Sequence, residues 1–217
     1  MSLAEQLASA LNRGDEQPNI ELANKLAKQS ETSSEILELF GIVRHGHKPQ
    51  QHDAIKVLYE LASLKPHSFA DKLEFVFDLL RAKDNRVLWG TLTLLSKCCH
   101  LDRDATAEQM SLILDAAARG SVIAKDATFD ILLAVANDPS YQEALHPHIT
   151  QFLKDAKPNQ LPMYAEKLAN STLRFKSDEI THILFSRLEE MPTEAKRKRL
   201  EKAIAKISLP PTPLALA

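Results

Sequence analysis

Glycine and aromatic residues are scarce in this sequence. Only five Gly, three Tyr and one Trp occur among its 217 residues, whereas Ala, Leu, Lys and Glu are abundant. Alanine and unbranched side chains lose little conformational entropy in a helix. The composition therefore predicts a helical protein.

Long apolar segments and a strong charge excess are also missing. No run approaches the roughly 18 uninterrupted apolar residues that a membrane span requires. The first residues, MSLAEQ, have neither the basic region nor the apolar core of a secretory signal. The formal net charge of −2 argues against a general nucleic-acid binder, which usually carries a clear basic excess. We expect a cytoplasmic protein with no membrane contact.

Familiar catalytic patterns are absent as well. The sequence has no Gly-rich phosphate loop, no Gly-x-Ser-x-Gly elbow and no His-Glu-x-x-His pattern. His45, His47 and His52 gather around one turn, and neutral imidazoles can bind zinc, copper or nickel. Their spacing lacks a fourth ligand and matches no usual zinc pattern, so a solvated turn is the simpler interpretation. We predict no enzyme and no catalytic, cofactor-binding or metal-binding residues.

What the sequence does contain is a repeat. Apolar residues recur three and four positions apart along nearly the whole chain, which indicates amphipathic helices and no strands. Six similar phrases, NKLAKQ, YELASL, TLLSKC, ILLAVA, EKLANS and KAIAKI, each contain one apolar residue taken as the inward-facing anchor. These anchors are spaced 35, 34, 38, 35 and 36 residues apart: Leu26, Leu61, Leu95, Leu133, Leu168 and Ile204.

A period near 35 predicts about six helix pairs that must stack to bury their apolar faces. The pairs are expected over residues 2–29, 33–64, 67–99, 104–136, 139–171 and 177–206, within a single domain of residues 1–207. Basic residues recur where the first helices end, as the helix dipole favours: Arg44, Arg81, Arg119 and Lys154. Residues 208–217, SLPPTPLALA, form a proline-rich tail whose PPTP resembles a minimal proline-rich ligand.

The third unit, LEFVFDLLRAKDNRVLWGTLTLLSKC, resembles the HEAT-repeat family. Asp84 fits the turn between the paired helices of that family, and Arg86-Val87 reverses its usual Val-Arg order. The resemblance covers almost the whole chain, with degenerate motifs. It implies a right-handed α-α superhelix, and a partner-binding face formed by the second helices.

We interpret the chain as a monomeric adaptor or scaffold that binds a protein or peptide. Two alternatives remain, a HEAT-like DNA-repair glycosylase or nucleic-acid-binding protein, and a regulatory subunit or chaperone of an enzyme. HEAT-like glycosylases line a basic face with several Trp, whereas this chain has one Trp and a slightly negative net charge. Since phosphate contacts dominate such binding, the nucleic-acid alternative is weakened.

The binding surface can be predicted from helix geometry. If each anchor points inward, residues two and five before it and two after it point outward at 100° per residue. Trp89 lies on the flank of this outward face. The predicted partner-binding residues are Lys56, Tyr59, Trp89, Thr93, Lys97, Thr128, Ile131 and Val135. For Ile131 and Val135 the other interpretation is that a neighbouring helix covers them.

Two further features have a structural and a functional interpretation. Cys98 lies three residues after Leu95, on the inward side, so packing is a simpler role than redox chemistry. Helical neighbours point about 100° apart, which places Cys98 and Cys99 badly for a disulfide. The basic run at residues 196–206, KRKRLEKAIAK, is either a solvated end cap or a docking site for an acidic partner or nucleic acid.

Overall fold

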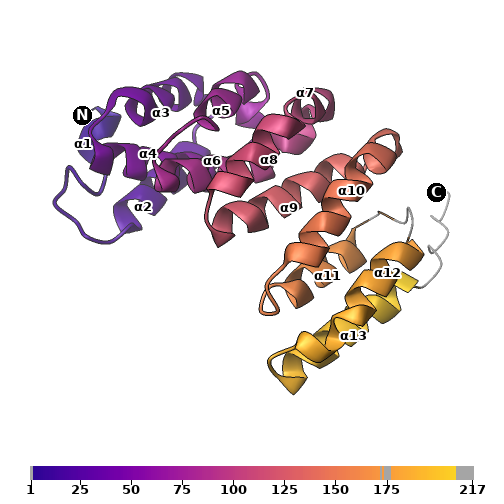
Figure 1. Ribbon diagram of the computed structural model, residues 1–217. Coiled ribbons are helices and arrows are strands. Elements are labelled where there is room, and N and C mark those ends of the chain that lie inside the picture. The colour runs from indigo at the N-terminus through magenta and orange to yellow at the C-terminus, as the bar shows by residue number, and fades with distance from the viewer. Residues whose placement is uncertain (1, 172, 174–176, 209–217) are drawn as a thin grey trace. The chain divides into compact units, whose positions relative to one another are not determined.

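The computed structural model describes residues 2–171, 173 and 177–208. Every regular element within these residues is a helix, which confirms the predicted all-α fold (Figure 1). The chain forms two compact units, Met1–Ile131 (unit 1) and Leu132–Ala217 (unit 2), and their boundary falls inside one helix. Apart from Ser208, the predicted proline-rich tail lies outside the described residues.

Unit 1 contains three helix pairs and the start of a fourth. In chain order its helices are α1 (Leu3–Gln6), α2 (Gln17–Ala27), α3 (Ser33–His45), α4 (Lys48–Leu64), η1 (Pro66–Phe69), α5 (Leu73–Leu79), α6 (Asn85–Cys98), η2 (Cys99–Leu101), α7 (Arg103–Glu108) and α8 (Met110–Arg119). Helix α9 (Val122–Ala136) crosses the boundary between the units. The fourth predicted pair therefore has its first half divided between α7 and α8.

Unit 2 continues with two more pairs. Its helices are α10 (Pro139–Asp155), α11 (Leu161–Asn170), α12 (Ser177–Ser186), η3 (Leu188–Glu190) and α13 (Glu194–Ser208). Among the helices formed by the described residues, none is both long and apolar enough to cross a bilayer.

The second helices stack on one another within each unit. Helix α4 packs against both α2 and α6 in unit 1, and α11 packs against α13 in unit 2. Gly90 allows α6 to approach α4 closely, because a Cβ atom at this position would lie 2.6 Å from Cγ1 of Ile55. Gly90 is itself buried at this contact.

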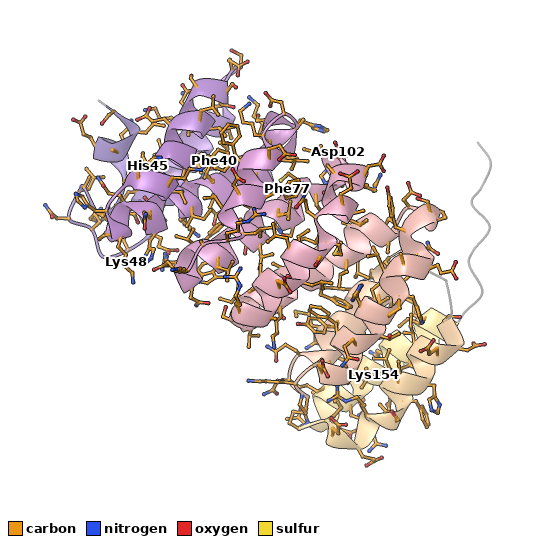
Figure 2. The ribbon with its side chains drawn as sticks, turned by 45° about the horizontal axis from the view of Figure 1, so that its top comes forward. Phe40, His45, Lys48, Phe77, Asp102 and Lys154 are labelled. Atoms are coloured by element: carbon orange, nitrogen blue, oxygen red, sulfur yellow. The ribbon has the colours of Figure 1, made fainter. Side chains whose placement is uncertain are left out.

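The inward anchors of the repeat are buried in five of the six helix pairs. Leu26, Leu61, Leu95, Leu133 and Leu168 are all buried. The sixth anchor is wrong, because Ile204 is partly exposed and its neighbours in α13 are buried instead: Leu200, Ala203 and Ile207. In unit 1 the rings of Phe40 in α3 and Phe75 in α5 are stacked with their centres 5.6 Å apart, which joins two successive pairs. Phe40 and Phe77, both labelled in Figure 2, are 1% and 3% exposed.

Arginine side chains connect successive pairs. The guanidinium of Arg119 donates hydrogen bonds to the carbonyls of Leu80 and Ala82, which follow the end of α5. In unit 2 the guanidinium of Arg187 donates in the same way to the carbonyls of Leu153 and Lys154, at the end of α10. A basic residue at the end of one first helix thus satisfies carbonyls at the end of the preceding one.

Candidate functional site on the second helices of unit 1

Polar and aromatic side chains from three second helices meet in unit 1. Residue 16 precedes α2, residues 56, 59 and 60 belong to α4, and residues 86 and 89 to the first turns of α6. We call this set the aromatic cluster. Its members are Glu16, Lys56, Tyr59, Glu60, Arg86 and Trp89.

Each aromatic ring of the cluster has a cation three residues before it on the same helix. The Lys56 ammonium lies 4.8 Å from the centre of the Tyr59 ring, and the Arg86 guanidinium lies 5.7 Å from the centre of the Trp89 ring. Residues three apart are neighbours on a helix surface, so this spacing brings each cation over its ring. The two rings are 5.8 Å apart and tilted by 46°, which joins α4 to α6.

Two carboxylates complete the cluster. The Lys56 ammonium lies 2.6 Å from Glu60 and 3.3 Å from Glu16. The Arg86 guanidinium also pairs with Glu16, so this carboxylate links α4 to α6. Burial alone would lower the pKa of Lys56, but its hydrogen bonds with Glu60 and Tyr59 raise it above its ordinary value. Lys56 is therefore a fixed cation at neutral pH.

Exposure decides which of these groups an incoming molecule can reach. The Lys56 side chain is only 10% exposed, while those of Glu16, Glu60 and Arg86 are 40%, 31% and 34% exposed. Trp89 is partly exposed, and Tyr59 is buried. The reachable surface is therefore two carboxylates, one guanidinium and the Trp89 ring.

Five of the eight predicted binding residues lie on or beside this surface. Lys56, Tyr59 and Trp89 belong to the cluster. Thr93 is partly exposed one turn after Trp89, and its hydroxyl donates to the Trp89 carbonyl at 2.9 Å. Lys97, one turn further, is exposed.

The outward orientation predicted on α9 is wrong. Thr128, Ile131 and Val135 are each 0% exposed. Leu132 is 0% exposed and the anchor Leu133 is 7% exposed, so both belong to the core, and the buried side of α9 is wider than a single anchor predicts. The partly exposed positions of this helix are Asp126, Asp130 and Ala134.

Sequence reasoning missed Glu16, Glu60 and Arg86. A signal was present for Arg86, because two consecutive helix pairs share one pattern. In each, a cation is followed three residues later by an aromatic residue, as Lys56–Tyr59 and Arg86–Trp89. The pattern itself predicts the stacking of each cation on its ring. The role of Glu16 has no local signal, since its partner Arg86 is 70 residues away.

The two cysteines are buried, and one of the clustered histidines is paired. Cys98 and Cys99 are free thiols with 0% exposure, and burial raises the pKa of both, that of Cys99 to about 12. His52 lies 2.9 Å from the Asp84 carboxylate. In the part of the chain that the structure describes, no three His, Cys, Asp or Glu residues are gathered so that they could hold a metal ion.

The basic run of α13 is paired within unit 2. Arg199 makes two hydrogen bonds to Glu166 of α11, at 2.7 and 2.6 Å. Lys206 donates to the side chain of Asn170 at 2.6 Å, and Lys196 donates to that of Asn159. Arg199 and Lys206 join α13 to α11, and Lys196 joins it to the turn before α11, so much of the basic charge holds the last helix pair against the preceding one.

No protein-family model matches the sequence, and no curated protein matches it. Among solved structures, the chain is similar to an engineered protein of the Northeast Structural Genomics Consortium, with a TM-score of 0.60 and 15% identity over 95% of this chain and 97% of that one. It is also similar to a designed armadillo repeat protein in complex with the peptide (KR)4, with a TM-score of 0.61 and 12% identity over 95% and 100% of the two chains. These similarities show an α-solenoid repeat fold, and the HEAT assignment stays a prediction.

Proposed function

We propose that the protein is a non-enzymatic peptide-binding scaffold, and that a segment of its partner docks on the aromatic cluster of unit 1. The observation that carries this proposal is the partly exposed Trp89 ring, surrounded by ion-paired side chains on stacked second helices. Trp, Tyr and Arg are the residues most enriched among energetically important interface positions. The designed neighbour with this fold was solved with a peptide bound.

The charges of the cluster favour a segment that carries Lys or Arg. Glu16 and Glu60 are the more exposed partners of a largely buried Lys56, so a partner meets their carboxylates first. A cationic side chain could pair with these carboxylates and lie on the Trp89 ring. The armadillo neighbour was solved with a peptide made of Lys and Arg, which is consistent with this chemistry. We further expect a cytoplasmic monomer.

The single Trp makes the proposal directly testable. The fluorescence of Trp89 would be followed during titration with (KR)4, with (ED)4 and with an uncharged peptide of the same length. We expect a saturable change with (KR)4 alone, weakened by added salt because the charges are exposed. Glu60→Gln should weaken binding about fivefold or more, as expected for a lost charge-assisted contact.

Glu74→Gln is the matched control, since Glu74 is an exposed carboxylate on a first helix of unit 1. It should leave the affinity unchanged. If none of the three peptides changes the fluorescence, the cluster is not a peptide site. If the uncharged or acidic peptide binds and (KR)4 does not, peptide binding stands and the basic specificity is wrong.

A further inference from the structure

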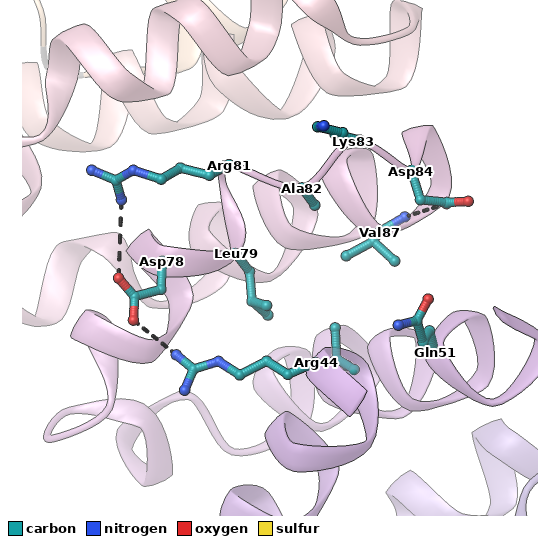
Figure 3. A pocket seen from close by; sticks show the side chains of 10 residues that line it. Arg44, Gln51, Asp78, Leu79, Arg81, Ala82, Lys83, Asp84 and Val87 are labelled. Carbon is teal, nitrogen blue, oxygen red and sulfur yellow. Dashed lines mark hydrogen bonds and ion pairs between the residues drawn. The ribbon is translucent and has the colours of Figure 1, made fainter. Parts of the chain in front are cut away.

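A second surface of unit 1 is an open pocket beside the turn that joins α5 to α6 (Figure 3). Its volume is about 370 Å³, within the range of ligand sites, and it shares no residue with the aromatic cluster. We call it the turn pocket. Its lining residues come from the second helix pair, α3 and α4, and from the third, α5 and α6 with their turn. They are Val43, Arg44, Gln51, Asp78, Leu79, Arg81, Ala82, Lys83, Asp84 and Val87.

The turn pocket has apolar and charged lining groups. The apolar ones include Val43, Leu79 and Val87, which are 3%, 6% and 4% exposed and belong to the core. The charged ones are three cations and two carboxylates, so their formal charge is positive by one. The balance between these charges depends on which of them are already paired.

Both carboxylates of the pocket are engaged. Asp84 caps α6 by accepting hydrogen bonds from the backbone N–H groups of Arg86 and Val87, and it lies 3.1 Å from Lys48 and 2.9 Å from His52. Asp78 accepts a hydrogen bond of 2.8 Å from Arg44 (Figure 3). Neither carboxylate needs a further donor.

Two carbonyls of the turn are engaged as well. Those of Leu80 and Ala82 accept hydrogen bonds from Arg119, at 2.7 and 3.2 Å. The Arg119 guanidinium also adds positive charge beside the turn. Acceptors around the pocket are thus largely occupied.

The donors are not. Arg81 is 65% exposed, and its nearest carboxylate, Asp78, is 3.9 Å away, too far for a hydrogen bond. Lys83 is exposed and has no hydrogen bond or ion pair with any residue that the structure describes. Arg44 is held in place by the Phe75 ring, 5.2 Å from its guanidinium, and uses one nitrogen for Asp78. The pocket therefore has unused donors, and its ligand must supply acceptors.

We propose that the turn pocket binds an acidic peptide segment, with a carboxylate on Arg81 and Lys83 and a neighbouring apolar side chain over Val43, Leu79 and Val87. A guanidinium matches the planar shape of a carboxylate, and Asp78 already occupies such a place between Arg44 and Arg81. The volume exceeds that of a single small anion and has room for a carboxylate with an apolar neighbour.

The test uses the full chain and two short peptides. Acetylated and amidated Leu-Glu-Leu-Glu and Leu-Gln-Leu-Gln would be titrated into isotope-labelled protein, with backbone amide shifts recorded by NMR. The Glu peptide should shift the amides of residues 80–87 saturably, and the Gln peptide should not. Arg81→Gln and Lys83→Gln should each weaken binding about fivefold, and the double variant by more.

Lys28→Gln, an exposed lysine at the end of α2, is the matched control and should bind like the unaltered protein. Asp78→Asn removes the carboxylate that bonds Arg44 and lies 3.9 Å from Arg81, so this variant should bind the Glu peptide at least as tightly. Equal shifts with both peptides, or unchanged affinity in the double variant, would overturn the proposal. It would also be overturned if inorganic phosphate gave the same shifts at the same concentration, because the pocket would then recognise a simple oxyanion.

Discussion

The second helices of the two units use their cations differently. In unit 1, Lys56 and Arg86 lie over aromatic rings and share Glu16, and one of those rings, Trp89, is partly exposed. In unit 2, Arg199 pairs with Glu166, and Tyr164 of α11 is buried. The longer basic run thus joins α13 to neighbouring segments of unit 2, whereas the two cations of unit 1 lie in the cluster proposed to bind a peptide.

This difference shows that the density of charged residues in a sequence does not tell how many of them are available to a binding partner. The four consecutive basic residues 196–199 are the most conspicuous charge feature of the chain. Each of them has a carboxylate or amide partner within unit 2. Surface ion pairs of this kind contribute little stability each, but they leave fewer groups free for a partner.

The largest effect is expected on α9, where the sequence predicted a continuation of the binding surface. Ile131→Asp places a carboxylate at a position with 0% exposure, which should cost more than about 4 kcal/mol and unfold much of the protein. Ile123→Asp, on the same helix at 50% exposure, should change the free energy of unfolding by less than about 0.5 kcal/mol. Urea denaturation followed by circular dichroism measures both. A stable Ile131→Asp variant would return α9 to the binding surface.

The repeat could be predicted from the sequence because its apolar period is regular. Leu61, Leu95 and Leu168 are buried as expected, since each lies on a helix with one apolar side and one polar side. Helix α9 gave no such contrast, because Ile131 to Val135 are apolar throughout and any of them could face inward. Periodicity fixes a helix rotation only where polar residues interrupt the apolar ones.

The site could be predicted only in part, for a different reason. Lys56, Tyr59 and Trp89 follow from positions along single helices. Glu16 joins them through contacts between units of the repeat, at separations that no local pattern encodes. The sequence therefore indicated the face and its aromatic residues but not the ion pairs that set its charge.

A second prediction tests whether the stability of both units depends on the buried anchor residues of the repeat. Leu95→Ala in α6 and Leu168→Ala in α11 should each lower the free energy of unfolding by about 2–5 kcal/mol, the range for truncating a buried leucine. Leu64→Ala, at 51% exposure, is the control and should cost less than about 0.5 kcal/mol. A small loss at Leu95 with a large one at Leu168 would mean that the repeat register holds only in unit 2.

The third prediction concerns acid stability at the turn between α5 and α6. Burial alone would raise the pKa of Asp84, but hydrogen bonds from Val87, Lys48 and His52 lower it from 3.8 to about 2. A lowered carboxyl pKa stabilises the folded state above pH 3.8, and this contribution disappears as the pH falls through about 2. Asp84→Asn keeps a good N-cap and removes the charge.

At pH 6 this variant should therefore be less stable by about 1–2 kcal/mol, and the difference should shrink steadily below pH 4. Urea denaturation at several pH values measures it. A difference that is the same at pH 2.5 and pH 6 would show that the amide disturbs packing and that the charge of Asp84 contributes nothing.

The smallest effects on stability, and the clearest separation of the two units, are expected from Arg86→Ala and Arg199→Ala. Both side chains are substantially exposed, so each substitution should cost less than about 1 kcal/mol after solvent screening. Arg86→Ala uncovers the Trp89 ring and frees Glu16, so it should change the fluorescence spectrum and tighten the binding of (KR)4. Arg199→Ala should change neither, since its partner Glu166 belongs to α11 in unit 2. The opposite pattern, with peptide binding sensitive to Arg199 and indifferent to Arg86, would move the binding surface from the aromatic cluster to the basic helix, because only a partner held by α13 would register the loss of that guanidinium.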